Sequence, residues 1–463
     1  MENNSFVNFD LSAIDAERIS SLIEEKNYQQ LKGILSDMPA PDVAELIGVC
    51  ERRLHPVIFR LLSKEHAAET FIDMDTDSQR ALIDSFSDSE LSQMLSELYI
   101  DDMVDIIEEM PAVVVKRIIK ATGKEDRAAI NAILRYPKDS AGSVMTTEYV
   151  RFRGDMTVGD ALNHIRRVAI DKETIYTCYV TDKDRNLLGI VTAKQLLISD
   201  LTLTLSDIMN ENIICVNTHD SREEVARKLE KYGFLAMPVV DNENRLVGII
   251  TVDDALDVIT EESEEDFAKM AAITPGDEPY LKSSVFDIFK SRVPWLLILM
   301  ISSTLSSTIL NVFESALPAV LVLFVPMIMG TGGNSGGQSS VTVTRSISLS
   351  EITFADLWRV FYKELRVGVL CATAVGGATF LKVLLIDKLL MNNAAITVTV
   401  ALTVAVSLAL TIIVAKIIGA TLPMLAKRVG LDPAVMASPL ITTLVDALSL
   451  IVYFFIASNF LPI

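Results

Sequence analysis

The first stretch of the chain, from about residue 12 to 135, has apolar residues at helical spacing. Leu91, Met94, Leu95 and Leu98 share one helical face. Breaks such as Met110-Pro111 interrupt this pattern every one to two dozen residues. The pattern predicts short helical hairpins stacked into a small all-α solenoid, although no strict repeat period is present.

The second stretch, from about residue 144 to 260, alternates helical segments with short β-branched runs. It contains an internal repeat: residues 186–192 (NLLGIVT) match residues 245–251 (RLVGIIT), with the two glycines 59 positions apart. Val144-Met145 likewise matches Ile208-Met209, 64 positions further on. The repeat predicts two β-α-β-β-α units, each too small for a good core of its own, that pack together.

The third stretch, from Val293 onward, is predicted to lie in a membrane. It contains five apolar spans, each close to the roughly 20 residues that a bilayer requires. They lie at about 293–313, 317–341, 367–388, 394–419 and 434–460.

The charges beside these spans predict their orientation. The chain begins with a polar, acidic segment (MENNSFVNFD), so we expect no cleavable signal and a cytoplasmic N-terminus. An odd number of spans then places the C-terminus outside. The membrane is expected to be the plasma or inner membrane of the cell. The basic residues that flank the predicted cytoplasmic sides agree with this topology: Lys282, Lys290, Arg292, Arg345, Arg359, Lys363, Arg366, Lys427 and Arg428.

Composition sharpens the contrast between the two halves. The net charge is −20, but the first 292 residues carry −22 and the remainder +2. Nucleic-acid binding requires a basic footprint, so this class of partner is excluded. An acidic surface suits solubility or divalent cations. The four cysteines lie far apart, which excludes a disulfide framework and a cysteine-based zinc site.

Asp446 lies in the middle of the fifth span. A carboxylate there costs several kcal/mol unless it meets a cation or faces water, so it is a functional candidate. We expect Lys382, Lys388 and Lys416 to lie near span ends and to snorkel, which leaves a soluble cation as the partner. The alternative is a neutral aspartic acid bonded to a neighbouring helix. Asp432, which precedes Pro433, is expected to be a structural helix N-cap.

The second span contains five glycines in eight residues, shortly after Pro326. We expect them to open or break the helix, which would free carbonyl oxygens beside Asn334 and Gln338. Hard oxygen ligands suit magnesium or calcium. The alternative is a small-residue face for helix packing. The Gly-x-Ser-x-Gly pattern around Ser335 does not predict catalysis, because all four histidines lie in the soluble half.

An acidic segment connects the repeat to the first span. On a helix, Glu261, Glu264 and Glu265 share one face and repel one another by a few tenths of a kcal/mol per pair. A bridging divalent cation would remove this repulsion, and we expect the helix to lead into the first span. An ordinary solvated helix is the alternative.

Together these segments resemble the MgtE family of magnesium transporters over nearly the whole chain. The resemblance is carried by residues 136–145 (YPKDSAGSVM), 251–257 (TVDDALD), 330–339 (GTGGNSGGQS) and 432–446, which ends in Asp446. The repeated unit resembles a tandem CBS pair, a sensory module.

The resemblance implies a multi-domain fold. It would consist of an acidic helical N-domain (1–140), an α/β tandem CBS pair (141–258), an acidic plug helix (259–292) and a five-span α-helical pore domain (293–463). It also implies a homodimer in the lipid membrane that imports Mg²⁺ down its gradient and closes when cytosolic Mg²⁺ bridges the acidic domains.

The resemblance also assigns residues. Asp446 would be the pore carboxylate and Asn334 would line the path. The regulatory Mg²⁺ ligands would be Asp254, Asp257, Glu262, Glu265, Asp266, Glu223, Asp101, Asp102 and Asp105.

This sequence departs from the family pattern at two places. Gly233 stands where relatives carry an acid, and Gln195 replaces the nucleotide-binding aspartate of the first CBS unit. At most one nucleotide site, an ATP site at Thr251 and Asp254, is therefore expected. Two other functions stay open: a cation-coupled secondary transporter, in which Asp446 handles a proton or sodium, and a membrane-anchored CBS sensor without transport.

Overall fold

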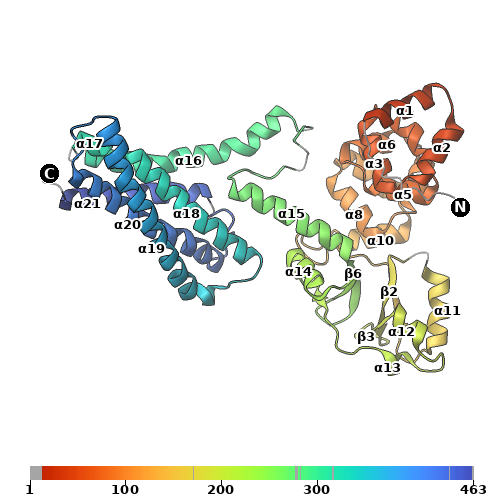
Figure 1. The fold of residues 1–463 in the computed structure, drawn as a ribbon. Helices are drawn as coiled ribbons and strands as arrows, with labels where there is room; N and C mark the ends of the chain where they lie inside the picture. Colours follow the sequence, from red (N-terminus) through yellow and green to blue (C-terminus); the bar gives the residue numbers. More distant parts are fainter. Residues whose placement is uncertain are drawn as a thin grey trace, which may run out of the picture. The chain divides into compact units, whose positions relative to one another are not determined.

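The computed structural model describes residues 13–169, 172–276, 280–281, 283–314, 318–436 and 438–460. Lys282 and the first twelve residues, on which part of the topology prediction depends, lie outside these ranges. The chain separates into two compact units, Met1–Ile259 and Thr260–Ile463. The multi-domain class is confirmed: stacked helices, two small α/β units and a set of long apolar helices follow one another along the chain (Figure 1).

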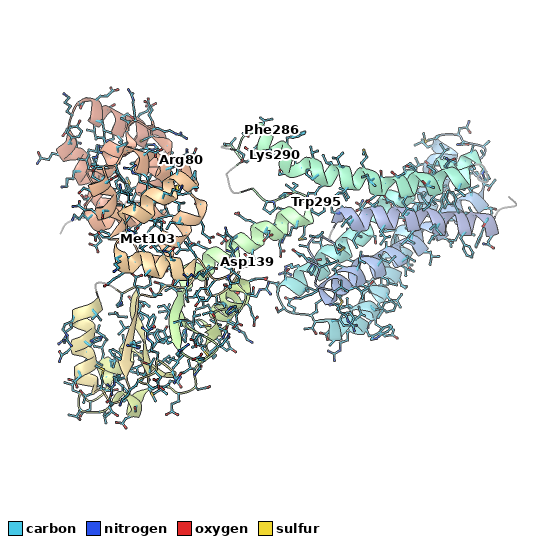
Figure 2. The ribbon with its side chains drawn as sticks, turned by 180° about the vertical axis from the view of Figure 1, so that it is seen from behind. Arg80, Met103, Asp139, Phe286, Lys290 and Trp295 are labelled. Atoms are coloured by element: carbon cyan, nitrogen blue, oxygen red, sulfur yellow. The ribbon has the colours of Figure 1, made fainter. Side chains whose placement is uncertain are left out.

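The first unit begins with ten short helices. Side-chain caps define where several of them start; the Ser87 hydroxyl and the Glu90 carboxylate, for example, form a reciprocal capping box. Helices contact the helix two places further on, as α3 does α5 and α5 does α7, which is the stacking of a solenoid. Met103 of α8 is part of their apolar core (Figure 2). The helices are α1 Ala13–Glu24, α2 Tyr28–Asp37, α3 Ala40–Val49, α4 His55–Phe59, α5 Lys64–Ile72, α6 Thr76–Ser85, α7 Asp88–Leu95, α8 Ile100–Glu109, α9 Ala112–Ala121 and α10 Lys124–Ile133.

Two three-stranded sheets of identical topology follow. In each sheet the first strand pairs parallel to the second, and the second pairs antiparallel to the third. Val180 lies opposite Gly189 in one sheet and Val239 opposite Gly248 in the other, so the register repeats with the sequence. The elements are β1 Tyr149–Arg153, α11 Val158–Val168, β2 Thr174–Thr181, β3 Leu187–Thr192, α12 Ala193–Ile198, α13 Leu205–Ile208, β4 Val216–Asn217, α14 Arg222–Tyr232, β5 Ala236–Val240 and β6 Leu246–Thr251.

The repeated methionines and glycines hold the two α/β units together. A Cβ atom at Gly189 would lie 2.6 Å from the sulfur of Met209, and one at Gly248 would lie 2.7 Å from the sulfur of Met145. Each sheet therefore accommodates the methionine that precedes the other copy of the repeat, and it can do so only because glycine has no side chain. Backbone bridges between Thr146 and Ile249 extend the same contact.

The acidic connector (residues 259–292) is helical at its beginning and at its end, but not throughout. Helix α15 runs without interruption from Val252 to Met270, directly after β6 (Figure 1). The next helix, α16, starts at Val285. The expected single helix leading into the first span is therefore wrong, because residues 271–276 are not helical.

The second unit is built on five helical segments that are long and apolar enough to cross a membrane, as predicted. Helices α18, α19, α20 and α21 pack closely on one another, and α16 packs against α21 (Figure 1). Lys290 lies over the ring of Phe286 at the start of α16, five residues before Trp295 (Figure 2). The elements are α16 Val285–Glu314, α17 Ala319–Val322, α18 Val325–Ser348, η2 Phe354–Asp356, α19 Leu357–Lys382, the π-helical η3 Val383–Leu390, α20 Val398–Arg428 and α21 Ser438–Phe460.

The glycine-rich segment does not break its helix. Helix α18 is continuous from Val325 to Ser348, so the expected opening is wrong and its backbone carbonyls stay within the helix. The glycines allow close packing instead: a Cβ atom at Gly419 of α20 would lie 2.2 Å from the carbonyl oxygen of Gly336. The small-residue packing alternative is the one the structure adopts.

Candidate metal sites

Asp446 is half-buried on α21, against the glycine face of α18. Its Oδ1 atom is buried and has no hydrogen-bond partner. A Cβ atom at Gly333 would lie 3.4 Å from this oxygen and 2.8 Å from the Thr442 methyl group. The glycine therefore provides the space beside the carboxylate. A buried carboxylate oxygen without a donor is costly, and a cation or its water shell would supply the missing partner.

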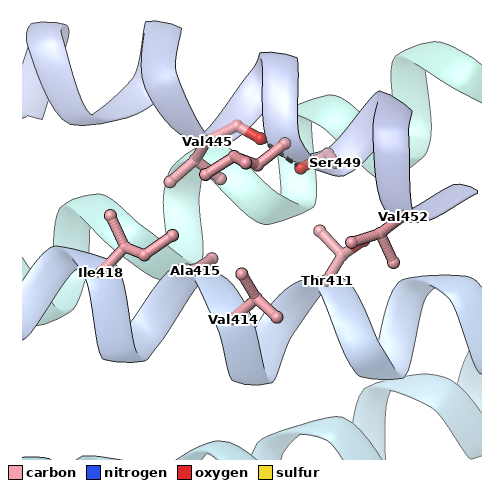
Figure 3. Close-up of a pocket in the computed structure, with 8 residues that line it drawn as sticks. Thr411, Val414, Ala415, Ile418, Val445, Ser449 and Val452 are labelled. Carbon is pink, nitrogen blue, oxygen red and sulfur yellow. Dashed lines mark hydrogen bonds between the residues drawn. The ribbon is translucent and has the colours of Figure 1, made fainter.

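A narrow crevice, with no room for a water molecule, lies between α20 and α21, and one of its lining residues, Val445, precedes Asp446 in the sequence (Figure 3). Its lining is mostly aliphatic, with Val414 and Ile418 on α20 and Val445 and Val452 on α21. The Ser449 hydroxyl is occupied, because it donates to the Val445 carbonyl oxygen at 2.6 Å. The crevice is thus mainly a packing feature, but the Thr411 hydroxyl that lines it is buried and has no hydrogen-bond partner.

Asn334 and Gln338 lie one turn apart on the exposed side of α18. Gly333, which precedes Asn334, is buried against Thr442 and Asp446. Within this single chain the amide of Asn334 faces outward, where it is open to water or to another subunit.

Lys416 contradicts the expectation that it snorkels from a span end. Only 6% of the residue is exposed, in the interior of α20. Its Nζ atom lies 3.4 Å from the Ser339 hydroxyl, which donates to the Glu364 carboxylate at 2.7 Å. Ser339 therefore links a buried cation on α20 to an anion on α19. The carbon chain of Lys416 packs near Gly368 of α19.

Lys382 is also paired rather than free to snorkel. Its Nζ atom lies 2.8 Å from Asp387, five residues along the chain. The π-helical turn, with its i to i+5 spacing, brings the two side chains together.

The first unit contains an internal cluster of acids, formed by Asp101 and Asp102 of α8, Glu173 beside β2, and Asp254 of α15. Asp101 is 6% exposed, and its Oδ1 atom has no hydrogen-bond partner. The Oε2 atom of Glu173 is likewise buried without a partner. Asp254 caps its own helix, because its Oδ2 atom accepts from the Thr251 hydroxyl at 2.5 Å.

The pKa values of this cluster are raised by burial and by mutual repulsion. Burial, and then the charge of Asp254, raise the pKa of Asp102 to about 7. Burial, Asp102 and Asp254 raise the pKa of Glu173 to about 8. The pKa of Asp101 rises well above its usual range for the same reasons. Burial raises the pKa of Asp254 to about 6, although the Thr251 hydrogen bond opposes this. The cluster therefore stores electrostatic repulsion that a divalent cation would relieve.

Glu148 and Glu173 were not identified from the sequence. The Oε2 atom of Glu148 accepts from the Ile100 backbone amide at 3.0 Å, directly before Asp101. The Glu173 amide in turn donates to the Glu148 carbonyl oxygen at 2.9 Å. Both belong to the first α/β unit, far from α8 in sequence, and no local spacing indicates this juxtaposition.

The other expected regulatory residues are more dispersed. Asp257 is close enough to Asp73 to raise the pKa of Asp73, after the larger effect of burial. Asp105 is exposed on α8. Glu223 forms an ion pair with Arg227, one turn further along α14.

The end of α15 contacts the membrane unit through three polar side chains. Lys269 lies 2.6 Å from Glu265 and 2.7 Å from Asp432. Burial opposes the charge of Lys269, but hydrogen bonds to Asp432 and Glu265 raise its pKa above the usual value. The Ser348 hydroxyl donates to Asp266 at 3.0 Å. Glu262 is partly buried on the same helix.

Asp432 is not a helix N-cap. Its Oδ1 atom accepts from the Ala434 amide at 2.8 Å, but α21 begins only at Ser438, so it caps a turn. Its second oxygen holds Lys269, a role that the sequence did not indicate.

These acids do not form a ready-made coordination sphere. Within the described ranges, no three histidine, cysteine, aspartate or glutamate side chains converge closely enough to hold a bare metal ion.

The fold defines a multi-pass membrane protein whose first unit is acidic and contains two small α/β repeats. The sequence profile of the MgtE divalent cation transporters matches residues 325–456, that of the MgtE intracellular N domain matches 42–139, and that of the CBS domain matches 141–200 and 205–261. The chain belongs to the MgtE family.

Two proteins named magnesium transporter MgtE illustrate the relationship. The one from Thermus thermophilus is 36% identical over 96% of this chain and 97% of its own length. The one from Bacillus subtilis is 29% identical over 96% of this chain and 97% of its own. A crystal structure of the cytosolic domain of the Mg²⁺ channel MgtE in complex with ATP covers 52% of this chain and 99% of its own, at 35% identity and a TM-score of 0.50.

Proposed function

We propose that this protein is a homodimeric channel that carries Mg²⁺ across the cell membrane, with Asp446 as the pore carboxylate. The observation that carries the proposal is the buried Oδ1 atom of Asp446, which has no donor of its own and lies beside the space left by Gly333. A hydrated Mg²⁺ ion would donate to this oxygen through its water shell. The full-length relatives that are named magnesium transporters support the choice of ion.

The exposed amide of Asn334 would line the same path once a second subunit faces α18. The proposed topology has a cytoplasmic N-terminus and an external C-terminus, so α15 and the helical domain would meet cytosolic Mg²⁺. The basic side chains Lys427 and Arg428, at the end of α20, lie on the side expected to be cytoplasmic.

Regulation would begin at the cluster of Asp101, Asp102, Glu173 and Asp254. With Mg²⁺ present, their repulsion is screened and the helical domain and the CBS pair are held together. When Mg²⁺ falls, repulsion or proton uptake replaces the ion. Asp254 lies near the start of α15, and the same helix ends in Lys269, which pairs with Asp432. A displacement of Asp254 therefore has a covalent, helical route to the membrane unit.

Nucleotide binding at Thr251 and Asp254 is the second proposed input, supported by the related cytosolic domain that was crystallised with ATP. In this chain Asp254 is occupied by Thr251 and by the acid cluster. Gln195, its counterpart in the first CBS unit, forms a capping box with Thr192 and donates to the Ile208 carbonyl oxygen. A nucleotide bound at Asp254 would compete with its hydrogen bond to Thr251 and with the acid cluster, so ATP and Mg²⁺ are expected to influence each other's binding.

The pore proposal is tested by Mg²⁺ uptake into liposomes that contain purified full-length protein. Asp446→Asn removes the charge at nearly constant shape and should abolish uptake, whereas Glu351→Gln, an exposed acid of the same unit, should leave it unchanged. A proton or sodium gradient should not be required. Uptake that persists in Asp446→Asn contradicts the pore assignment, and uptake that depends on a gradient of another cation supports a coupled transporter.

A further inference from the structure

A pocket of about 240 Å³ lies at one end of the second unit, where α18 and α20 both terminate. Its floor is apolar and is formed by Ile347, Ile352 and Met424. This volume lies just below the range of small-molecule sites in proteins, roughly 300–1,000 Å³. Neither Asp446 nor any residue of the crevice between α20 and α21 lines this pocket.

The rim of the pocket carries two cations. The Arg428 guanidinium lies 4.2 Å from the centre of the Phe354 ring, which fixes the orientation of its plane. The Lys427 Nζ atom lies 3.5 Å from the Ile347 carbonyl oxygen, a long contact that leaves donor capacity. Among the residues that the structure describes, neither cation forms an ion pair with a carboxylate, whereas nearby Arg359 is paired with Asp356.

Hydroxyl groups complete the rim. Ser350 and Thr353 line the pocket between α18 and η2. Ser350 has a φ of 55°, a left-handed conformation that glycine adopts most readily. Serine at this helix C-terminus carries a conformational cost of about 1 kcal/mol. The Thr353 hydroxyl donates to Asp356 at 3.2 Å, so it has only its lone pairs left to offer a ligand.

Exposed aromatic side chains indicate the depth of the pocket in the membrane. Trp358 and Tyr362, on the first turns of α19, are 66% and 57% exposed. Tryptophan and tyrosine concentrate at the level of the lipid headgroups. The pocket therefore opens where headgroup phosphates are abundant, and the basic residues place it on the cytoplasmic leaflet of the proposed topology.

We propose that this pocket binds the phosphate headgroup of an anionic phospholipid. The Arg428 fork and the Lys427 ammonium would hold the phosphate, Ser350 and Thr353 lie within the same rim, and the apolar floor would contact the glycerol and the upper acyl chain. Free phosphate offers the same charge but cannot use the apolar floor or the membrane depth.

The test measures the binding of short-chain lipids to the purified, delipidated full-length protein by native mass spectrometry. The probes are dioctanoyl phosphatidylglycerol, dioctanoyl phosphatidylcholine, glycerol 3-phosphate and inorganic phosphate. Lys427→Gln/Arg428→Gln should weaken phosphatidylglycerol binding about 30-fold, at roughly 1 kcal/mol per basic residue. The matched control, Arg359→Gln/Lys363→Gln, removes the same charge from the same membrane side and should bind as the unmodified protein does.

A charge-conserving variant tests whether substitution at these two positions disrupts the fold. Lys427→Arg/Arg428→Lys should retain most of the affinity for phosphatidylglycerol. Equal binding of the two lipids, or an equal loss in the pocket variant and the matched control, would overturn the proposal, because either result indicates a diffuse basic surface. Glycerol 3-phosphate or inorganic phosphate that binds as tightly as phosphatidylglycerol would overturn the lipid assignment.

Discussion

Asp102→Asn should stabilise the first unit of this protein in the absence of Mg²⁺. Asp102 has a pKa of about 7, raised from 3.8 first by burial and then by Asp254. A shift of this size corresponds to about 4 kcal/mol of differential interaction. Because the neighbouring acids are protonated more readily when Asp102 is charged, part of this energy is shared, and we expect a gain of about 2–4 kcal/mol.

The sign of the pH dependence follows from the raised pKa. The stabilising contribution of protonated Asp102 is fully present below about pH 4, declines as the pH rises, and is lost above about pH 7. The asparagine variant lacks this decline. Its free energy of unfolding should therefore match that of the unmodified protein near pH 4 and exceed it at pH 7.5.

Mg²⁺ should narrow the difference in stability between the variant and the unmodified protein. An ion that binds only the folded state at 100 times its dissociation constant adds about 2.7 kcal/mol to the unmodified protein. The variant should gain less, because one member of the cluster is neutral. Binding should also release protons, so the affinity for Mg²⁺ should rise between pH 6 and pH 8.

The assay is urea unfolding of residues 1–270 in EDTA and in Mg²⁺, since the corresponding domain of a relative has been crystallised. Asp84→Asn, an exposed acid on α6, is the matched control and should change the free energy of unfolding by less than about 0.5 kcal/mol. The reasoning is refuted if Asp102→Asn is no more stable than the unmodified protein in EDTA at pH 7.5, or if Mg²⁺ stabilises both equally.

Three further predictions concern the second unit. Gly419→Ala should abolish folded protein in a thermal-stability assay, because its Cβ atom would lie 2.2 Å from the Gly336 carbonyl oxygen. Gly377→Ala, whose Cβ atom would have no atom within 4 Å, should be tolerated. Equal stability of the two variants would contradict the role of Gly419 in packing α20 on α18. Lys416→Met and Glu364→Gln should each lower the free energy of unfolding by about 3 kcal/mol, because each change leaves the other charge unpaired. The double variant should lose less than the sum of the two; additive losses would show that Ser339 does not couple Lys416 to Glu364. Lys269→Met should shift the Mg²⁺ concentration at which current stops in patch-clamp recordings, whereas Lys290→Met, at an exposed lysine, should not. If Lys269→Met leaves this concentration unchanged, the Lys269–Asp432 contact has no part in gating.

Local patterns were sufficient for much of the fold. Apolar periodicity predicted the stacked helices and the five spans, and the 59-residue repeat predicted two sheets of identical topology. Both depend on interactions within a few residues or on direct sequence repetition. Asp446 was also recognisable, because a lone carboxylate in an apolar helix is conspicuous by its cost.

Tertiary contacts decided the features that the sequence did not indicate. Glycines weaken an isolated helix, but close packing of α18 on α20 outweighs that cost and keeps α18 continuous. Lys416 reaches an anion on another helix through Ser339, so its position along α20 could not show whether it snorkels. Glu173 joins Asp101 through folding of segments about 70 residues apart, a relationship without any local signal.

The central claim is tested most directly by recording Mg²⁺ current from inside-out membrane patches that contain the full-length protein, with Mg²⁺ on the cytoplasmic face varied. The account predicts unitary current at low cytoplasmic Mg²⁺ that disappears as this concentration is raised, and no current from Asp446→Asn at any concentration. Mg²⁺ current through Asp446→Asn of normal size, or current in the unmodified protein that is indifferent to cytoplasmic Mg²⁺, would contradict it.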